Sequence, residues 1–97
     1  MIAVIAKMPV KPESKDDAIN EVKNLMAKVA EEEGTLHYTV NVAQNDPNTL
    51  VFMERYRDME ALGVHGSTPH FQEFMGKAMN FASGPPEIVV LDEIHSI

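Results

Sequence analysis

Six segments of regular periodicity follow one another along the 97-residue chain, and their order constrains the fold more than any other feature. Four of them show the apolar patterns of strands, and two repeat apolar residues at the three- and four-residue spacing of helices. The order is strand, helix, strand, strand, helix, strand. Since connections between such elements are short and right-handed, it predicts an α+β fold, the ferredoxin-like βαββαβ arrangement. In that fold a four-stranded antiparallel sheet carries both helices on one face.

The first part of the chain supplies a strand and a helix. Residues 1–10 are apolar on both sides of a strand up to Ala6, as in a central strand covered on both faces. Ser14 and Asp17 resemble a capping box that opens the helix, and Gly34 is its expected end. The acidic run at 31–33 is most simply a solvated helix end, with contact to a basic partner as the alternative.

A hairpin is predicted next. Residues 35–43 alternate in polarity, residues 45–48 have strong turn chemistry, and residues 49–57 form the returning strand. On this second strand Phe52, Glu54 and Tyr56 share one face.

The last third predicts a split helix and a final strand. Asp58 can cap a short helix over 59–65 that Gly66 breaks. Ser67 or Thr68 can cap the next helix, with Pro69 in its first turn. A strand over 87–95 follows the Gly-Pro-Pro segment.

Composition excludes several classes of function. The length suits a single domain over residues 1–97. With no cysteine, disulfides, thiol catalysis and thiolate metal sites are ruled out. The net charge of −7 disfavours a nucleic-acid partner, which needs a basic surface. No segment approaches the roughly 20 apolar residues of a membrane span and no targeting segment is evident, so we expect a cytoplasmic protein without membrane contact.

The sheet face opposite the helices also carries apolar side chains. An exposed apolar face of this kind favours association, so we expect a homodimer formed through the sheet face.

The chain resembles the antibiotic biosynthesis monooxygenase family of dimeric α+β barrels. The resemblance covers nearly the whole chain and rests on three stretches, MIAVIAKMPVKP, EEEGTLHYTV and FMERYRDMEALGVHGSTPHFQEF. It implies that a small aromatic quinol or naphthol is oxidised by molecular oxygen with no flavin, haem or metal cofactor. The substrate is then its own reductant, and the protein supplies a base and a dry apolar cavity for a small aromatic or hydrophobic molecule.

The resemblance implies His65 as the base, and an imidazole of ordinary pKa, about 6.5, can accept a proton at neutral pH. A purely structural place at a helix junction is the alternative. Tyr56 and Glu54 complete the predicted catalytic set. If Glu54 faces the helices it needs a partner, and we expect His65, with a lysine or arginine at the dimer edge as the alternative. Tyr56 can also serve only in cross-strand packing.

Substrate-binding residues are predicted between the sheet and the helices. His70, at the start of the second helix, either orients the substrate or lies on the surface. The apolar lining is expected to comprise Phe52, Phe71, Phe74, Met75 and Met79, although the same residues could form ordinary core.

Other chemistries have less support. His65 and His70 are five residues apart and would not share one helix face, so no metal site is expected. The stretch from ERYRD to TPHF and the later Ser83-Gly84-Pro85 look about as similar to a second branch of the family, isomerases that act on a small phosphorylated signalling dione. Such an isomerase needs a cationic phosphate site, for which the candidates are Lys7, Arg55, Arg57 and Lys77. The predicted function is therefore a cofactor-independent quinol-type monooxygenase, with that isomerase or a non-catalytic dimeric binding module as the alternatives.

Overall fold

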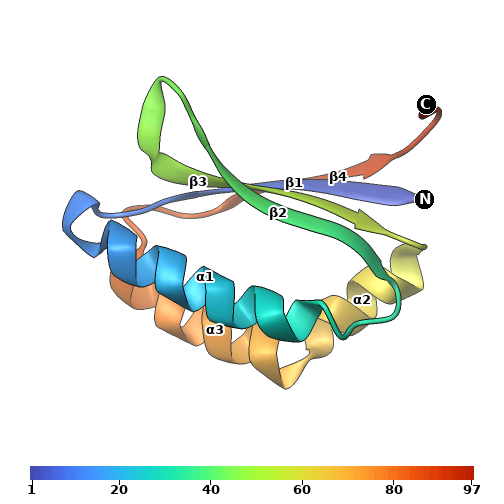
Figure 1. Ribbon diagram of the computed structural model, residues 1–97, viewed down its shortest axis with the longest axis horizontal. Helices are drawn as coiled ribbons and strands as arrows, with labels where there is room; N and C mark the ends of the chain where they lie inside the picture. Colours follow the sequence, from blue (N-terminus) through green and yellow to red (C-terminus); the bar gives the residue numbers. More distant parts are fainter.

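The strands and helices form two layers (Figure 1). The computed structural model describes residues 1–97. One layer is an antiparallel sheet of β1 (Ile2–Pro9), β2 (Thr35–Ala43), β3 (Asp46–Tyr56) and β4 (Glu87–Asp92), in the order β2-β3-β1-β4. The other layer contains α1 (Lys15–Val29), α2 (Met59–Ser67) and α3 (Pro69–Phe81), all on one face of the sheet. The ferredoxin-like arrangement predicted from the sequence is confirmed.

Alternation along the two central strands decides which side chains meet the helices. The register pairs Val4 with Glu54 and Met8 with Leu50, so these residues share the helix-facing side of β1 and β3. Each fully buried aliphatic or aromatic side chain stabilises the fold by about 1.5–3 kcal/mol. The main core consists of Met8, Val10, Ala18, Val22, Leu25, Val29, Leu50, Phe52, Phe74, Ala78 and Phe81.

The start and end of α1 differ from the prediction. Pro12–Ser14 forms a 3-10 turn, and α1 then begins at Lys15. The Ser14 side chain makes no capping hydrogen bond, so the predicted capping box is wrong. Its backbone lies at φ −105° and ψ 2° rather than in the extended region that an N-cap adopts.

Gly34 does not end α1, which stops at Val29. No glycine in the chain has a positive φ, so Gly34 is not a left-handed cap. Its importance is the close approach of α2, because an added Cβ at Gly34 would lie 2.5 Å from the Cβ of Ala61. The turn between α1 and β2 therefore rests directly on α2.

The other predicted boundaries are confirmed in part. Asp58 caps α2 by accepting a hydrogen bond from the Ala61 N–H at 2.8 Å, and Thr68 caps α3 by accepting from the Phe71 N–H at 3.2 Å. α2 runs through Gly66 instead of breaking there. The hairpin turn is shorter than predicted, since β3 begins at Asp46, and β4 ends at Asp92 rather than residue 95.

The face of the sheet away from the helices is uncovered (Figure 1). Ile5 on β1 pairs with Met53 on β3 and with Val89 on β4, so these side chains form one apolar row on that face. Met53 and Val89 are exposed, and so is every residue of β4. None of the helices is long and apolar enough to cross a membrane.

Candidate active site

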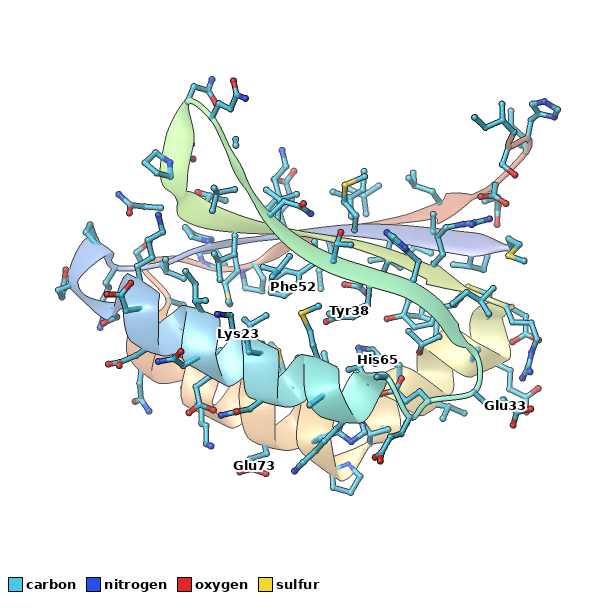
Figure 2. The ribbon with its side chains drawn as sticks, in the orientation of Figure 1. Lys23, Glu33, Tyr38, Phe52, His65 and Glu73 are labelled. Carbon is cyan, nitrogen blue, oxygen red and sulfur yellow. The ribbon has the colours of Figure 1, made fainter.

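A cavity of about 140 Å³ lies between the sheet and the helices α2 and α3. Its volume is close to that of apolar protein cavities that hold a single benzene ring. Figure 2 shows Tyr38 and Phe52 on the sheet side of this layer and His65 on the helix side. The lining residues are Val4, Ala6, Lys7, Met8, Tyr38, Phe52, Glu54, Leu62, His65, Gly66, Phe71, Phe74, Met75, Pro86 and Ile88.

His65 is buried on the inner face of α2, one turn after Ala61. Aromatic rings surround its imidazole: the ring centroids of Tyr38 and Tyr56 lie at 5.5 Å and that of Phe71 lies at 4.9 Å. These contacts confine the ring to one orientation against the cavity.

Glu32 is the hydrogen-bond partner of His65. His65 Nδ1 lies 2.9 Å from Oε1 and 3.2 Å from Oε2 of Glu32. The expected Glu54–His65 hydrogen bond is absent, so that part of the prediction is wrong. The acidic run is also not wholly solvated, because Glu31 and Glu33 are exposed while the Glu32 side chain is only 8% exposed. Figure 2 shows Glu33 projecting outward from this turn.

Two further groups bond to Glu32. Thr35 Oγ1 donates to Oε1 at 2.8 Å, and His70 Nε2 lies 2.5 Å from Oε2. Burial alone would raise the pKa of Glu32, but the hydrogen bonds from His70, Thr35 and His65 together hold it below its ordinary value. Glu32 is therefore ionised at neutral pH and can only accept hydrogen bonds.

The hydrogen bond to Glu32 bears on the tautomer of His65. An ionised carboxylate can only accept, so in a neutral imidazole this bond requires the proton on Nδ1 and leaves the lone pair on Nε2. Nε2 of His65 makes no hydrogen bond within the chain. It is also not one of the fully buried polar atoms that lack a partner, so it keeps some accessible surface. A basic nitrogen is thus available on a residue that lines the cavity.

Glu54 takes its hydrogen bond from Tyr56 instead of His65. The Tyr56 hydroxyl donates to Glu54 Oε1 at 2.5 Å. The two residues lie two positions apart on the same face of β3. Burial raises the pKa of Glu54, and the bond from Tyr56 and the nearby His65 offset this only in part. Tyr56 is completely buried and does not line the cavity, whereas Glu54 does.

Both tyrosines of the site remain neutral phenols. Burial raises the pKa of Tyr38, and the charges of Glu54 and Glu32 add to this effect. Burial and the hydrogen bond to Glu54 raise the pKa of Tyr56. Tyr38 also lies opposite Glu54 in the β2–β3 register, so both side chains form part of the sheet side of the cavity.

The predicted lining residues divide into two groups. Phe52, Phe71, Phe74 and Met75 line the cavity, but Met79 is 82% exposed on the outer side of α3. Met79 lies four residues after Met75 on α3, and a four-residue step turns an α-helix about 40° beyond a full turn. This rotation moves the Met79 side chain away from the cavity and into solvent. His70 also lies outside the cavity, on a surface groove between α1 and α3, and reaches the site only through Glu32.

Sequence reasoning missed Glu32 and Tyr38 as site residues. The sequence placed Tyr38 on the apolar face of its strand, which was an available signal for it. Nothing in the sequence distinguishes Glu32 from its two acidic neighbours. Three candidate cations pair with carboxylates away from the cavity: Arg55 with Glu93, Arg57 with Asp58, and Lys77 with Glu21 and Glu73. No group of three His, Cys, Asp or Glu side chains is arranged to hold a metal ion.

Comparisons with known proteins agree with this architecture. Residues 1–77 match the family model described as antibiotic biosynthesis monooxygenase. A Bacillus subtilis (strain 168) protein, "Putative monooxygenase YcnE", is 33% identical over 92% of this chain and 94% of its own length. Among solved structures, an antibiotic biosynthesis monooxygenase superposes with a TM-score of 0.91 at 30% identity, over 98% of this chain and 100% of its own. A Caulobacter crescentus CB15 structure, titled a putative antibiotic biosynthesis monooxygenase, reaches a TM-score of 0.93 at 29% identity, over 97% of this chain and 90% of its own.

Proposed function

Because the chain belongs to the antibiotic biosynthesis monooxygenase family, we propose that it oxidises a small aromatic quinol with molecular oxygen and without a cofactor. His65 acts as the base. The observation that carries the proposal is the free Nε2 of a Glu32-bound histidine on the wall of an apolar cavity of about 140 Å³. A base beside an apolar, ring-sized cavity is what this chemistry needs from a protein.

The proposed reaction begins with transfer of a phenolic proton to His65 Nε2. The phenolate passes one electron to oxygen, and the resulting radical and superoxide combine to form a C–O bond as a ring peroxide. The peroxide takes back the proton from His65 and becomes a hydroperoxide. The O–O bond and the C–H bond at the same ring carbon then break, so that carbon becomes a carbonyl and the departing hydroxide takes the C–H proton to leave as water. A hydroquinone and O2 give a hydroxyquinone and one H2O, so the substrate supplies all the electrons and the base returns to its starting state.

Glu54 and Tyr38 are suited to bind the substrate oxygen that lies away from His65. Both line the cavity from the sheet side, and the Tyr38 hydroxyl makes no hydrogen bond within the chain. The raised pKa of Glu54 favours its protonated form, which can donate a hydrogen bond to a quinone carbonyl. The apolar remainder of the lining contacts the faces of the ring.

The phosphorylated-dione isomerase has less support. A phosphate needs several positive charges, and Lys7 is the one lysine or arginine that lines the cavity. The arginines near the sheet are bound to carboxylates of this chain. A neutral aromatic substrate therefore suits the cavity better than a phosphorylated one.

The proposal includes a homodimer formed through the uncovered sheet face. The row of Ile5, Met53 and Val89 supports it, because a contiguous apolar row with two exposed members and one partly exposed member favours association. Light scattering should give twice the 10.8 kDa mass of one chain. Met53→Glu should dissociate the dimer, while Met79→Glu, an equal change on the exposed side of α3, should not. A wild-type monomer would refute the dimer.

Oxygen uptake by the purified protein tests the function. A panel of hydroquinones and naphthols would be assayed with the wild type, His65→Gln and Met79→Ala. We expect uptake above autoxidation, one O2 per quinol, and a loss of about 10²-fold or more in His65→Gln only. If no substrate supports uptake while the folded protein still binds these aromatics, the binding-module alternative replaces the enzyme.

A further inference from the structure

Glu32 has no assigned role in the proposed reaction. It lies outside the cavity lining, in the turn after α1, and bonds to two histidines at once. Its side chain is 8% exposed and that of His65 is 4% exposed, so their interaction is well shielded from water. A carboxylate that accepts three donors in such a place is expensive to bury unless every bond is made.

We propose that Glu32 is the positioning residue for His65, holding Nδ1 protonated and leaving Nε2 as the base. We also propose that His70 affects the reaction only by holding Glu32. This inference rests on the proposed role of His65 as base. The imidazolium that forms when Nε2 accepts a proton would gain a charge-assisted hydrogen bond to Glu32, which stabilises it during the reaction.

The fold holds Glu32 in place by several contacts. The missing side chain of Gly34 lets the turn approach Ala61, which is one helical turn before His65 on α2. The Arg57 N–H donates to the Gly34 carbonyl at 2.9 Å and ties the same turn to the end of β3. Thr35 Oγ1 then fixes the Glu32 carboxylate itself at 2.8 Å. The carboxylate is thereby directed at Nδ1 before any ligand binds.

The other ionisable groups near His65 lie on the sheet side. Glu54, Tyr38 and Tyr56 face the imidazole from β2 and β3, and none of them hydrogen-bonds to it. Glu32 is the one side chain that bonds to either ring nitrogen. Substitution of Glu32 should therefore allow His65 to populate both tautomers, while substitutions of the sheet-side residues should leave its tautomer unchanged.

The first test is the tautomer itself, measured by 15N and 13C NMR on histidine-labelled protein with His65→Gln to assign the signal. In the unliganded wild type we expect His65 protonated at Nδ1. Glu32→Ala should shift it towards a mixture of tautomers, while Glu31→Gln, which removes a neighbouring charge from an exposed side chain, should leave it unchanged. A wild-type His65 protonated at Nε2, or an unchanged tautomer in Glu32→Ala, would overturn the proposal.

The second test uses kinetics with a turned-over quinol. Glu32→Gln keeps an acceptor but loses the charge, so kcat should fall about 10- to 100-fold with little change in KM. Glu31→Gln should match the wild type. A kcat of Glu32→Gln equal to that of Glu31→Gln would overturn the role of Glu32 in the reaction. If no quinol is turned over at all, the NMR result still decides whether Glu32 sets the tautomer.

Two substitutions test whether His70 acts by donating a hydrogen bond to Glu32. His70→Gln can still donate to Glu32 and should keep nearly full kcat, whereas His70→Ala cannot and should lose several-fold. Equal losses in both variants would overturn the role given to His70 as a hydrogen-bond donor to Glu32.

Discussion

Gly34→Ala should destabilise the protein, because Gly34, in the turn after α1, packs closely against Ala61 on α2. The new Cβ would lie 2.5 Å from Ala61 Cβ, far inside ordinary contact, and 3.4 Å from Ala61 Cα, at the lower limit of ordinary contact. The turn or α2 must therefore shift. Overpacking of this kind costs about 1–3 kcal/mol. For a domain of this length each kcal/mol lowers Tm by about 4–8 °C.

The matched control is Gly63→Ala, in the middle of α2. A Cβ there meets nothing within 4 Å, so the substitution should raise stability by about 0.5–1 kcal/mol through helix propensity. The two glycine-to-alanine changes should therefore move Tm in opposite directions. Both would be measured by thermal and urea unfolding at one protein concentration, since association also shifts the midpoint.

A double-mutant cycle identifies the cause. Ala61→Gly removes the atom that the new Cβ meets, at a cost of about 1 kcal/mol in helix propensity. The double variant should lose less unfolding free energy than the sum of the losses in the two single variants, by about 1 kcal/mol or more. Strict additivity, or a Gly34→Ala variant as stable as the wild type, would refute the proposed contact between this turn and α2.

The remaining predictions concern the buried acids and the cavity wall. Tyr56→Phe removes the bond to Glu54 and should cost about 1–3 kcal/mol in urea unfolding; an unchanged midpoint would contradict that bond. The folded-state pKa of Glu32 lies below its ordinary value of 4.5, so the stability it contributes is present above pH 4.5 and is lost as the pH falls. The stability deficit of Glu32→Gln should shrink in acid, and a deficit independent of pH would refute this. Glu54 has the opposite sign: its raised pKa favours folding below pH 4.5, and this is lost as the pH rises. Glu54→Gln should thus gain stability relative to the wild type between pH 4.5 and neutrality. Met75→Ala should weaken aromatic binding in a titration while Met79→Ala should not, and equal effects would argue against the cavity as the binding site.

The predicted elements agree with the structure in their order and in the faces of their strands. The strand faces of Phe52 and Glu54 follow from the period of two, and the caps Asp58 and Thr68 follow from short-range hydrogen bonds. The errors lie at element ends, where competing local structures differ little in free energy. Ser14 illustrates this, because a 3-10 turn at Pro12–Ser14 takes the place of the expected cap.

The candidate site was predicted less completely. His65 and most of the apolar lining were selected, and the structure brings them to one cavity. The partner of His65 was not, because Glu54 and Glu32 are both carboxylates and only their positions in space distinguish them. Tyr56 reaches Glu54 from two residues along the same strand face, and this leaves His65 to the other acid.

The sequence alone determined the order of the elements and the faces of the strands, because periodicity and capping act within a few positions. Only the tertiary structure decided that Glu32, rather than Glu31, Glu33 or Glu54, meets His65. That pairing joins residues 33 positions apart, and it depends on how closely the turn at Gly34 can approach Ala61. Close packing between distant segments leaves no periodic signal, so it appears only when the chain is folded.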